Sequence, residues 1–146
     1  MVSKQAMAQR SQTRVHFDHR DMDYYLSWIL GREAWGASEA GECMDIAARI
    51  ADGDPQSWQR EWRRLAEQVE ETAENATRAG DLESARRAYL RACTYYRAPL
   101  FIMHPADPAF RETWQKMQAC FRQAAALTDP PIEAIHVPYQ GRELAG

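Results

Sequence analysis

The sequence has no apolar run near the roughly 20 residues that a membrane-spanning helix needs, and its N-terminus lacks the apolar core of a signal peptide. We therefore expect a protein that is neither exported nor membrane-bound. Cysteine is also scarce: Cys43, Cys93 and Cys120 are the three in 146 residues, and they lie far apart in helical sequence. This odd, dispersed set provides neither a disulfide framework nor a CxxC metal pair, which predicts a reducing, cytoplasmic compartment.

The composition argues against nucleic-acid binding and against a metal centre. With 18 basic and 21 acidic residues, the net charge is −3, so no broad positive field is available for a phosphate backbone. The histidines are too dispersed to ligate one metal ion: His16, His19, His104 and His136. We expect no metal, no cofactor and no nucleic-acid partner.

A serine nucleophile motif is missing as well. The nearest match is the segment 36–41, GASEAG, but a nucleophile elbow needs glycine two places before and two places after the serine, following a strand. Here Gly41 stands one place too far along, and the surrounding pattern is helical. We therefore predict that Ser38 caps a helix, and we identify no catalytic residue.

What the sequence does contain is helical periodicity. Apolar residues recur every three or four positions in five stretches, near 22–30, 38–51, 55–79, 82–99 and 108–129. Asp21 or Asp23 is available to cap the first stretch, and Asp54-Pro55 and Asp107-Pro108 provide a capping acid followed by a proline suited to the first helical position. Gly80 separates the third and fourth stretches so tightly that they must pair antiparallel.

The pattern changes at Asp129-Pro130-Pro131. Residues 132–139 alternate apolar and polar side chains as a half-buried strand does, and a Gln140-Gly141 turn follows. The predicted fold class is thus all-α, with about five helices in antiparallel pairs and a short C-terminal β-strand or hairpin. Positions 1–20 are expected to be a flexible tail, 21–129 a helical domain, and 130–146 the start of a sheet whose other strands are absent here.

An aromatic-rich segment at the end of the fourth helical stretch is the best candidate for ligand binding. Tyrosine combines an apolar ring with a polar tip, which suits a pocket for an oxygenated aromatic ligand, although core packing of Tyr89 and Tyr96 is the stronger interpretation. Tyr95 and Arg97 are expected off the apolar face. Glu42, beside Glu39 and Asp45, lies on a mostly solvated acidic face. The candidate substrate-binding residues are Trp28, Glu42, Tyr95, Tyr96, Arg97 and Met103.

Several blocks, read together, resemble a known family. They are residues 41–43, 48–54, 57–62, 85–92, 95–97, 120–122, 124–127, 129–133 and 137–141. The resemblance is to the N-terminal helical region of α/β-hydrolases that carry their cap in front of the catalytic domain, as in dihydroxypseudooxynicotine hydrolase and the fungal heptaketide-shortening hydrolases of pigment synthesis. It covers about Val15 to Gly146.

The resemblance implies a serine hydrolase whose cap covers the active site and shapes a pocket for an aromatic or polyketide-like substrate, with carbon–carbon or ester cleavage. Its catalytic triad would lie downstream of these residues, so none can be carried over. The implied partner is a catalytic α/β-hydrolase domain or subunit, or a second copy of the chain through self-association.

Two alternatives stay open. Gly80-Asp81 followed by Ala85, Tyr89 and Ala92 resembles the turn and second helix of a tetratricopeptide unit, which indicates a helical interaction module. A free-standing cap could instead bind a polyketide and steer its cyclisation, using Glu42 and the aromatic segment from Tyr95 to Met103.

Overall fold

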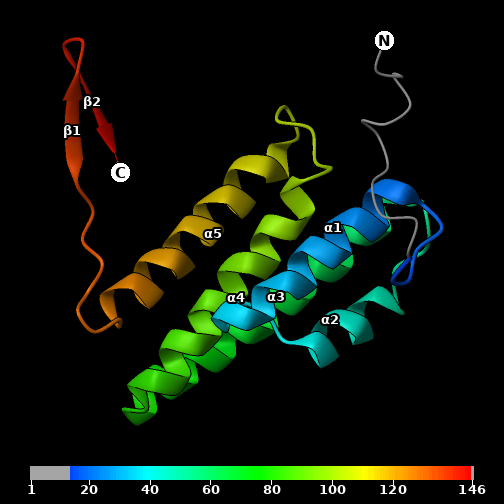
Figure 1. Cartoon of the computed structure of the whole chain (residues 1–146), viewed down its shortest axis with the longest axis horizontal. Coiled ribbons are helices and arrows are strands. Elements are labelled where there is room, and N and C mark those ends of the chain that lie inside the picture. Colours follow the sequence, from blue (N-terminus) through cyan, green and yellow to red (C-terminus); the bar gives the residue numbers. More distant parts are fainter. Residues whose placement is uncertain (1–13, 146) are drawn as a thin grey trace, which may run out of the picture.

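The computed structural model describes residues 14–145, which form a layer of helices and a separate C-terminal hairpin (Figure 1). The elements are α1 (Arg20–Leu30), the 3₁₀ helix η2 (Gly31–Trp35), α2 (Ala40–Ala47), α3 (Pro55–Ala79), α4 (Leu82–Leu100), α5 (Pro108–Ala126), β1 (His136–Tyr139) and β2 (Arg142–Ala145). The predicted five helices with a C-terminal hairpin are confirmed. Residues 1–13 of the expected tail lie outside the described residues, whereas Phe17 is buried against the helices.

The long helices begin and end where the sequence indicates. The carboxylates of Asp54, Asp81 and Asp107 each accept a hydrogen bond from a backbone N–H in the first turn of α3, α4 and α5. Gly80 ends α3 with a φ of 78°, a conformation that glycine adopts without a steric penalty. The two-residue connection folds α4 back along α3, as predicted.

Two predicted caps are wrong. The carboxylate of Glu39, not the hydroxyl of Ser38, caps α2 by accepting from the backbone N–H groups of Gly41 and Glu42. Ser38 is buried and donates to the carbonyl of Ile29, closing the connection after α1. The side chain of His19 caps α1 by accepting from the backbone N–H of Met22. The carboxylate of Asp23 instead accepts from the backbone N–H of His16, in the segment that precedes α1.

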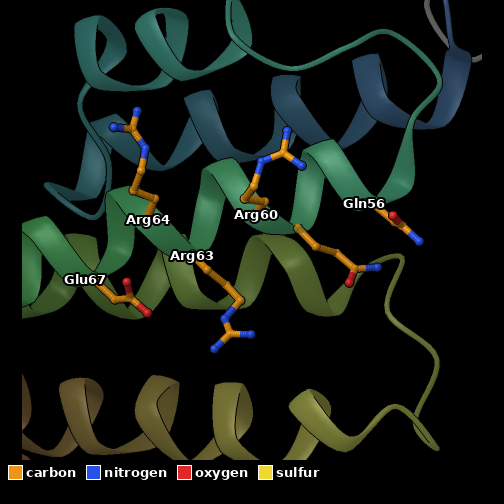
Figure 2. A pocket seen from close by; sticks show the side chains of 6 residues that line it. Gln56, Arg60, Arg63, Arg64 and Glu67 are labelled. Atoms are coloured by element: carbon orange, nitrogen blue, oxygen red, sulfur yellow. The ribbon is translucent and has the colours of Figure 1, made fainter.

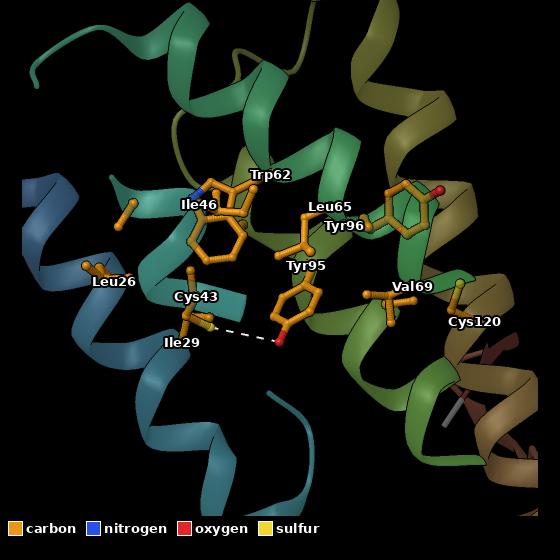
Figure 3. Packing of buried hydrophobic residues seen from close by; sticks show 14 of the residues in the cluster. Leu26, Ile29, Cys43, Ile46, Trp62, Leu65, Val69, Tyr95, Tyr96 and Cys120 are labelled. Carbon is orange, nitrogen blue, oxygen red and sulfur yellow. Dashed lines mark hydrogen bonds between the residues drawn. The ribbon is translucent and has the colours of Figure 1, made fainter. Parts of the chain in front are cut away.

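The core forms where α3 and α4 face each other, with α5 against one side of α4 and α1 and α2 on the other (Figure 1). Four large aromatic side chains are fully buried along it: Trp58, Trp62, Tyr95 and Tyr96. In the close view of this core, Tyr95 lies between α3 and α2 with its hydroxyl near Cys43, while Tyr96 points toward α5 (Figure 3). The expectation that Tyr95 lies off the apolar face is therefore wrong, since α4 is buried on two sides.

After the C-terminal end of α5 the chain turns back, and the hairpin stands apart from the helices in the view of Figure 1. Strands β1 and β2 pair antiparallel, with Tyr139 opposite Arg142. Gln140 and Gly141 both have positive φ, as a tight two-residue hairpin turn requires. Residues 129–144 are all exposed, so little of this segment is held by the core.

Within residues 14–145, none of the helices combines the length and the apolar character needed to cross a membrane.

Candidate functional site

Glu42 and Tyr95, two of the predicted site residues, meet at the interface of α2 and α4. The hydroxyl of Tyr95 donates to Oε2 of Glu42 at 2.6 Å and accepts from the backbone N–H of Glu39 at 2.9 Å. The guanidinium of Arg91 donates to the same carboxylate oxygen at 3.1 Å. Sequence reasoning missed Arg91, although its position one turn before Tyr95 on a helix was a usable signal.

This cluster stabilises the fold and is not arranged for acid–base chemistry. Burial, followed by the nearby Cys43 and the contact with Glu42, raises the pKa of Tyr95 far above its ordinary value. A phenol held protonated in this way cannot serve as a base near neutral pH. The hydrogen bond between the hydroxyl and the carboxylate therefore holds α2 against α4.

Trp28 and Arg97, also predicted, meet at a second place, between α1 and the end of α4. The guanidinium carbon of Arg97 lies 4.9 Å from the centre of the Trp28 ring, and that of Arg32 lies 4.0 Å from it. Phe101 packs edge-on against Trp28, with ring centres 5.2 Å apart, and stacks on Tyr25 at 4.8 Å. Two cations and three partly buried aromatic rings thus share one surface, which we call the Trp28 cluster: Tyr25, Trp28, Arg32, Arg97 and Phe101.

Arg32 was not predicted, although it stands four residues after Trp28. Burial lowers the pKa of Arg32 below its ordinary value, and the charge of Arg97 lowers it further. Its Nε is buried without a hydrogen-bond partner among the described residues. Neither arginine forms an ion pair with a carboxylate of residues 14–145, so within this range two guanidinium groups share one indole ring without an acidic partner.

The remaining predicted residues lie elsewhere. The hydroxyl of Tyr96 donates to Glu70 at 2.6 Å, and Lys116 bonds the same carboxylate at 3.0 Å, which joins α3, α4 and α5. Met103 is buried in the connection between α4 and α5. The six candidates thus do not form one site: two pairs form, and Tyr96 and Met103 are separate from both.

An open hollow of about 390 Å³ lies on the outer side of α3 (Figure 2). It is lined by Gln56, Gln59, Arg60, Arg63, Arg64 and Glu67. Its cations have acidic neighbours: Glu61 pairs with Arg60 and Arg64, and Arg63 lies 3.7 Å from Glu112. This balance of charge gives the hollow little attraction for an anion.

The three thiols are poor nucleophiles. Burial raises the pKa of Cys43 to about 11 and raises the pKa of Cys93 and Cys120 above their ordinary values. Among residues 14–145, no group of three or more histidine, cysteine or acidic side chains is placed to hold a metal ion. The described residues therefore show neither an activated thiol nor a metal centre.

Apolar side chains are exposed on α5 and the hairpin. Trp114 and Phe121, two turns apart on one face of α5, are 42% and 46% exposed. The connecting segment and hairpin add further exposed apolar residues: Ile132, Ile135, Val137, Tyr139 and Leu144. We call these seven residues the α5–hairpin surface. Several exposed apolar side chains on consecutive elements of the chain are typical of segments that another domain covers.

No protein-family model matches the sequence. The chain is, however, similar to several fungal proteins. It is 37% identical over 130 residues to Hydrolase ORFZ of Pyricularia oryzae, covering 86% of this chain and 31% of that protein. It is 38% identical over 113 residues to the 20-hydroxy-prefusarin hydrolase FUS2 of Gibberella moniliformis, covering 76% of the chain and 27% of that protein.

The chain is also 34% identical over 118 residues to the alpha/beta hydrolase xenA of Xenoacremonium sinensis. This match covers 81% of the chain and 28% of that protein. The chain thus spans less than a third of the length of these relatives. The resemblance recognised in the sequence blocks is confirmed.

Proposed function

Because the chain is homologous over most of its length to fungal α/β-hydrolases, we propose that it forms the helical cap of such a hydrolase. One observation carries this proposal: the match covers 86% of the chain but only 31% of Hydrolase ORFZ. The chain aligns with one portion of each of these longer relatives. In this proposal the cap covers the mouth of the active site, and an aromatic or polyketide-like substrate is cleaved by a serine triad on the remaining portion.

The chemistry of the described residues supports this division. A hydrolase of this kind needs a nucleophile beside a general base and oxyanion donors about 3 Å from the reacting carbon. The buried Ser38 donates its hydroxyl proton to a backbone carbonyl, and the thiols have raised pKa values. Residues 14–145 therefore offer positioning and binding groups but no activated nucleophile.

The α5–hairpin surface supports the same division. Trp114 and Phe121 expose ring surface on α5, and within residues 14–145 the hairpin has no further strand on either edge. Covering the part of each ring that is still exposed contributes on the order of 1 kcal/mol. We propose that the catalytic domain covers this surface.

An exchange of the cap region tests the proposal. In FUS2, the segment aligned with this chain is replaced by residues 15–146, and hydrolysis of 20-hydroxy-prefusarin is compared with that of FUS2 lacking the segment. The exchanged enzyme should regain turnover, with a changed KM. Turnover no better than that of the deleted enzyme, in a protein that is folded by circular dichroism, would contradict the cap role.

A matched pair of variants tests the docking surface in the same enzyme. Trp114→Ser with Phe121→Ser should reduce turnover and lower the temperature at which the two portions unfold together. Leu82→Ser removes a comparably exposed apolar side chain, 53% exposed, from the first position of α4, outside the α5–hairpin surface, and should leave both unchanged. Equal effects of the two changes would count against the α5–hairpin surface as the contact.

A further inference from the structure

The Trp28 cluster has a charge imbalance that its own contacts do not relieve. Arg32 approaches the indole ring from the 3₁₀ helix η2, at 4.0 Å from the ring centre, and Arg97 approaches it from α4, at 4.9 Å. Cation–π contacts hold such guanidinium groups in place but neutralise no charge. Neither arginine has a carboxylate partner among the described residues, whereas Arg86, Arg87 and Arg91 on α4 are all paired.

The geometry also leaves donors unused. The Nε of Arg32 is buried and has no partner in the part of the chain described, and a guanidinium carries five N–H donors in a planar fork. Leaving a buried donor unpaired is unfavourable, so the Arg32 side chain gains from a rearrangement that brings an acceptor to this N–H. A carboxylate or enolate matches the fork, since two oxygens can accept two parallel N–H groups.

The rings beside the arginines define the rest of the ligand. Trp28 and Phe101 are only partly buried and pack edge to face, so part of each aromatic side chain stays accessible beside the cations. Offset or edge-on contact with such rings favours a planar aromatic body. From these contacts, we propose that the Trp28 cluster binds a planar aromatic anion, with its carboxylate or enolate held between Arg32 and Arg97.

This proposal rests on the proposed function in one respect only: if the chain is a cap, the cluster faces the substrate of the hydrolase, and that substrate is the ligand. Binding itself is a property of this chain and is measured on it directly. Calorimetric titration of the full chain uses 2-naphthoate as the probe. The uncharged 2-naphthamide tests whether binding needs the carboxylate charge. Inorganic phosphate tests whether binding needs the aromatic ring.

We expect saturable binding of 2-naphthoate and no saturable binding of phosphate. We expect 2-naphthamide to bind at least about tenfold more weakly than 2-naphthoate, since a hydrogen bond to a charged group contributes a factor of about ten in affinity. Arg97→Gln should weaken naphthoate binding by about tenfold or more. Arg111→Gln, an exposed arginine of α5, removes the same charge and should change nothing. Equal affinity of the Arg97→Gln and Arg111→Gln chains would overturn the proposal, as would tight phosphate binding.

A second measurement keeps the test independent of Arg32, whose replacement could disturb the connection after α1. The indole N–H signal of Trp28, assigned by its loss in Trp28→Phe, should shift on titration with naphthoate while that of Trp58 stays in place. Binding without a shift at Trp28 would place the ligand elsewhere and refute the site. If the FUS2 exchange restores turnover but Arg97→Gln leaves its KM unchanged, the cap role stands and this inference fails.

Discussion

The hydroxyl of Tyr95 donates a hydrogen bond to Oε2 of Glu42 over 2.6 Å, joining residues 53 positions apart in the sequence. The same carboxylate oxygen accepts from Arg91, and the tyrosine oxygen accepts from the backbone of Glu39 at the start of α2. A short helix such as α2 has little stability of its own, so tertiary contacts must hold it. This bond is the specific contact that fixes α2 against α4.

Replacing Tyr95 with phenylalanine should destabilise the chain by about 2 kcal/mol, because a hydrogen bond to a charged group is lost in a buried setting. Urea denaturation followed by tryptophan fluorescence measures the change in the free energy of unfolding. Tyr139→Phe removes the same hydroxyl from the exposed hairpin and should leave stability unchanged. Equal stability of the two variants would mean that the bond contributes nothing.

The two buried tryptophans of α3 should differ when each is changed to phenylalanine. The indole N–H of Trp58 donates to the carbonyl of Ala98 at 2.9 Å, whereas that of Trp62 is buried without a partner in the described part of the chain. Both changes leave space in the core, but only Trp58→Phe also breaks a hydrogen bond. It should cost about 1 kcal/mol more than Trp62→Phe in thermal or urea unfolding. A larger loss for Trp62→Phe would contradict this account.

Asp23 should make stability depend on acid pH. Burial raises the pKa of Asp23, but hydrogen bonds from the backbone N–H groups of His16, Val15 and Phe17 lower it by more, so it lies below its ordinary value. The ionised carboxylate therefore stabilises the fold fully above the unfolded pKa, near about pH 4, and this contribution is lost as pH falls through the folded pKa.

Asp23→Asn should accordingly cost about 1–3 kcal/mol at pH 7, with a difference from the wild-type chain that narrows below about pH 4. Unfolding in urea at a series of pH values gives the comparison. Asp45→Asn, at an exposed pair with Arg49, should show little cost at any pH. A constant gap for Asp23→Asn down to pH 3 would rule out the carboxylate as the cause.

The thiols should react slowly while the chain is folded. With its pKa raised by burial to about 11, Cys43 carries on the order of 100-fold less thiolate at pH 8 than an unfolded cysteine. Labelling with an aromatic disulfide reagent, followed by mass spectrometry, should modify half-buried Cys93 first and Cys43 and Cys120 only as the chain unfolds. Ala119→Cys places a thiol on the exposed surface of α5 and should label at once.

Without a catalytic domain, the α5–hairpin surface should drive self-association. Sedimentation velocity of the isolated chain should show species larger than one chain whose proportion rises with concentration. Trp114→Ser with Phe121→Ser should shift the distribution toward single chains, while Leu82→Ser should not. A single-chain species for the unchanged protein at all concentrations would remove this expectation.

Much of the fold follows from local sequence. Capping aspartates, prolines at first helical positions and the glycine at position 80 act on the backbone within a few residues, so they place α3, α4 and α5 without reference to the rest. The caps at Ser38 and Asp23 failed for the opposite reason. Each side chain forms a hydrogen bond with a backbone group six to nine residues away. Helical periodicity contains no information about such contacts.

The candidate site was only partly predictable for a similar reason. Trp28 and Arg97 were both selected, but nothing in the pattern brings them together, because α1 and α4 are far apart in the sequence. Tyr95 was expected off the apolar face, as a pocket or interface group, since one apolar stripe was assumed for α4. That helix packs between α3 and α5 and also meets α1, so more than one face is buried.

The sequence by itself determined the helical class, the ends of the long helices, the hairpin turn and the relationship to α/β-hydrolases. Each of these depends on short-range backbone preferences or on residue identity. Only the tertiary structure decided that Arg32 and Arg97 share one indole ring, with no carboxylate partner in the described part of the chain, and that Tyr95 bonds Glu42. Such contacts depend on which helix faces meet, and the burial of apolar surface across the whole chain sets those faces.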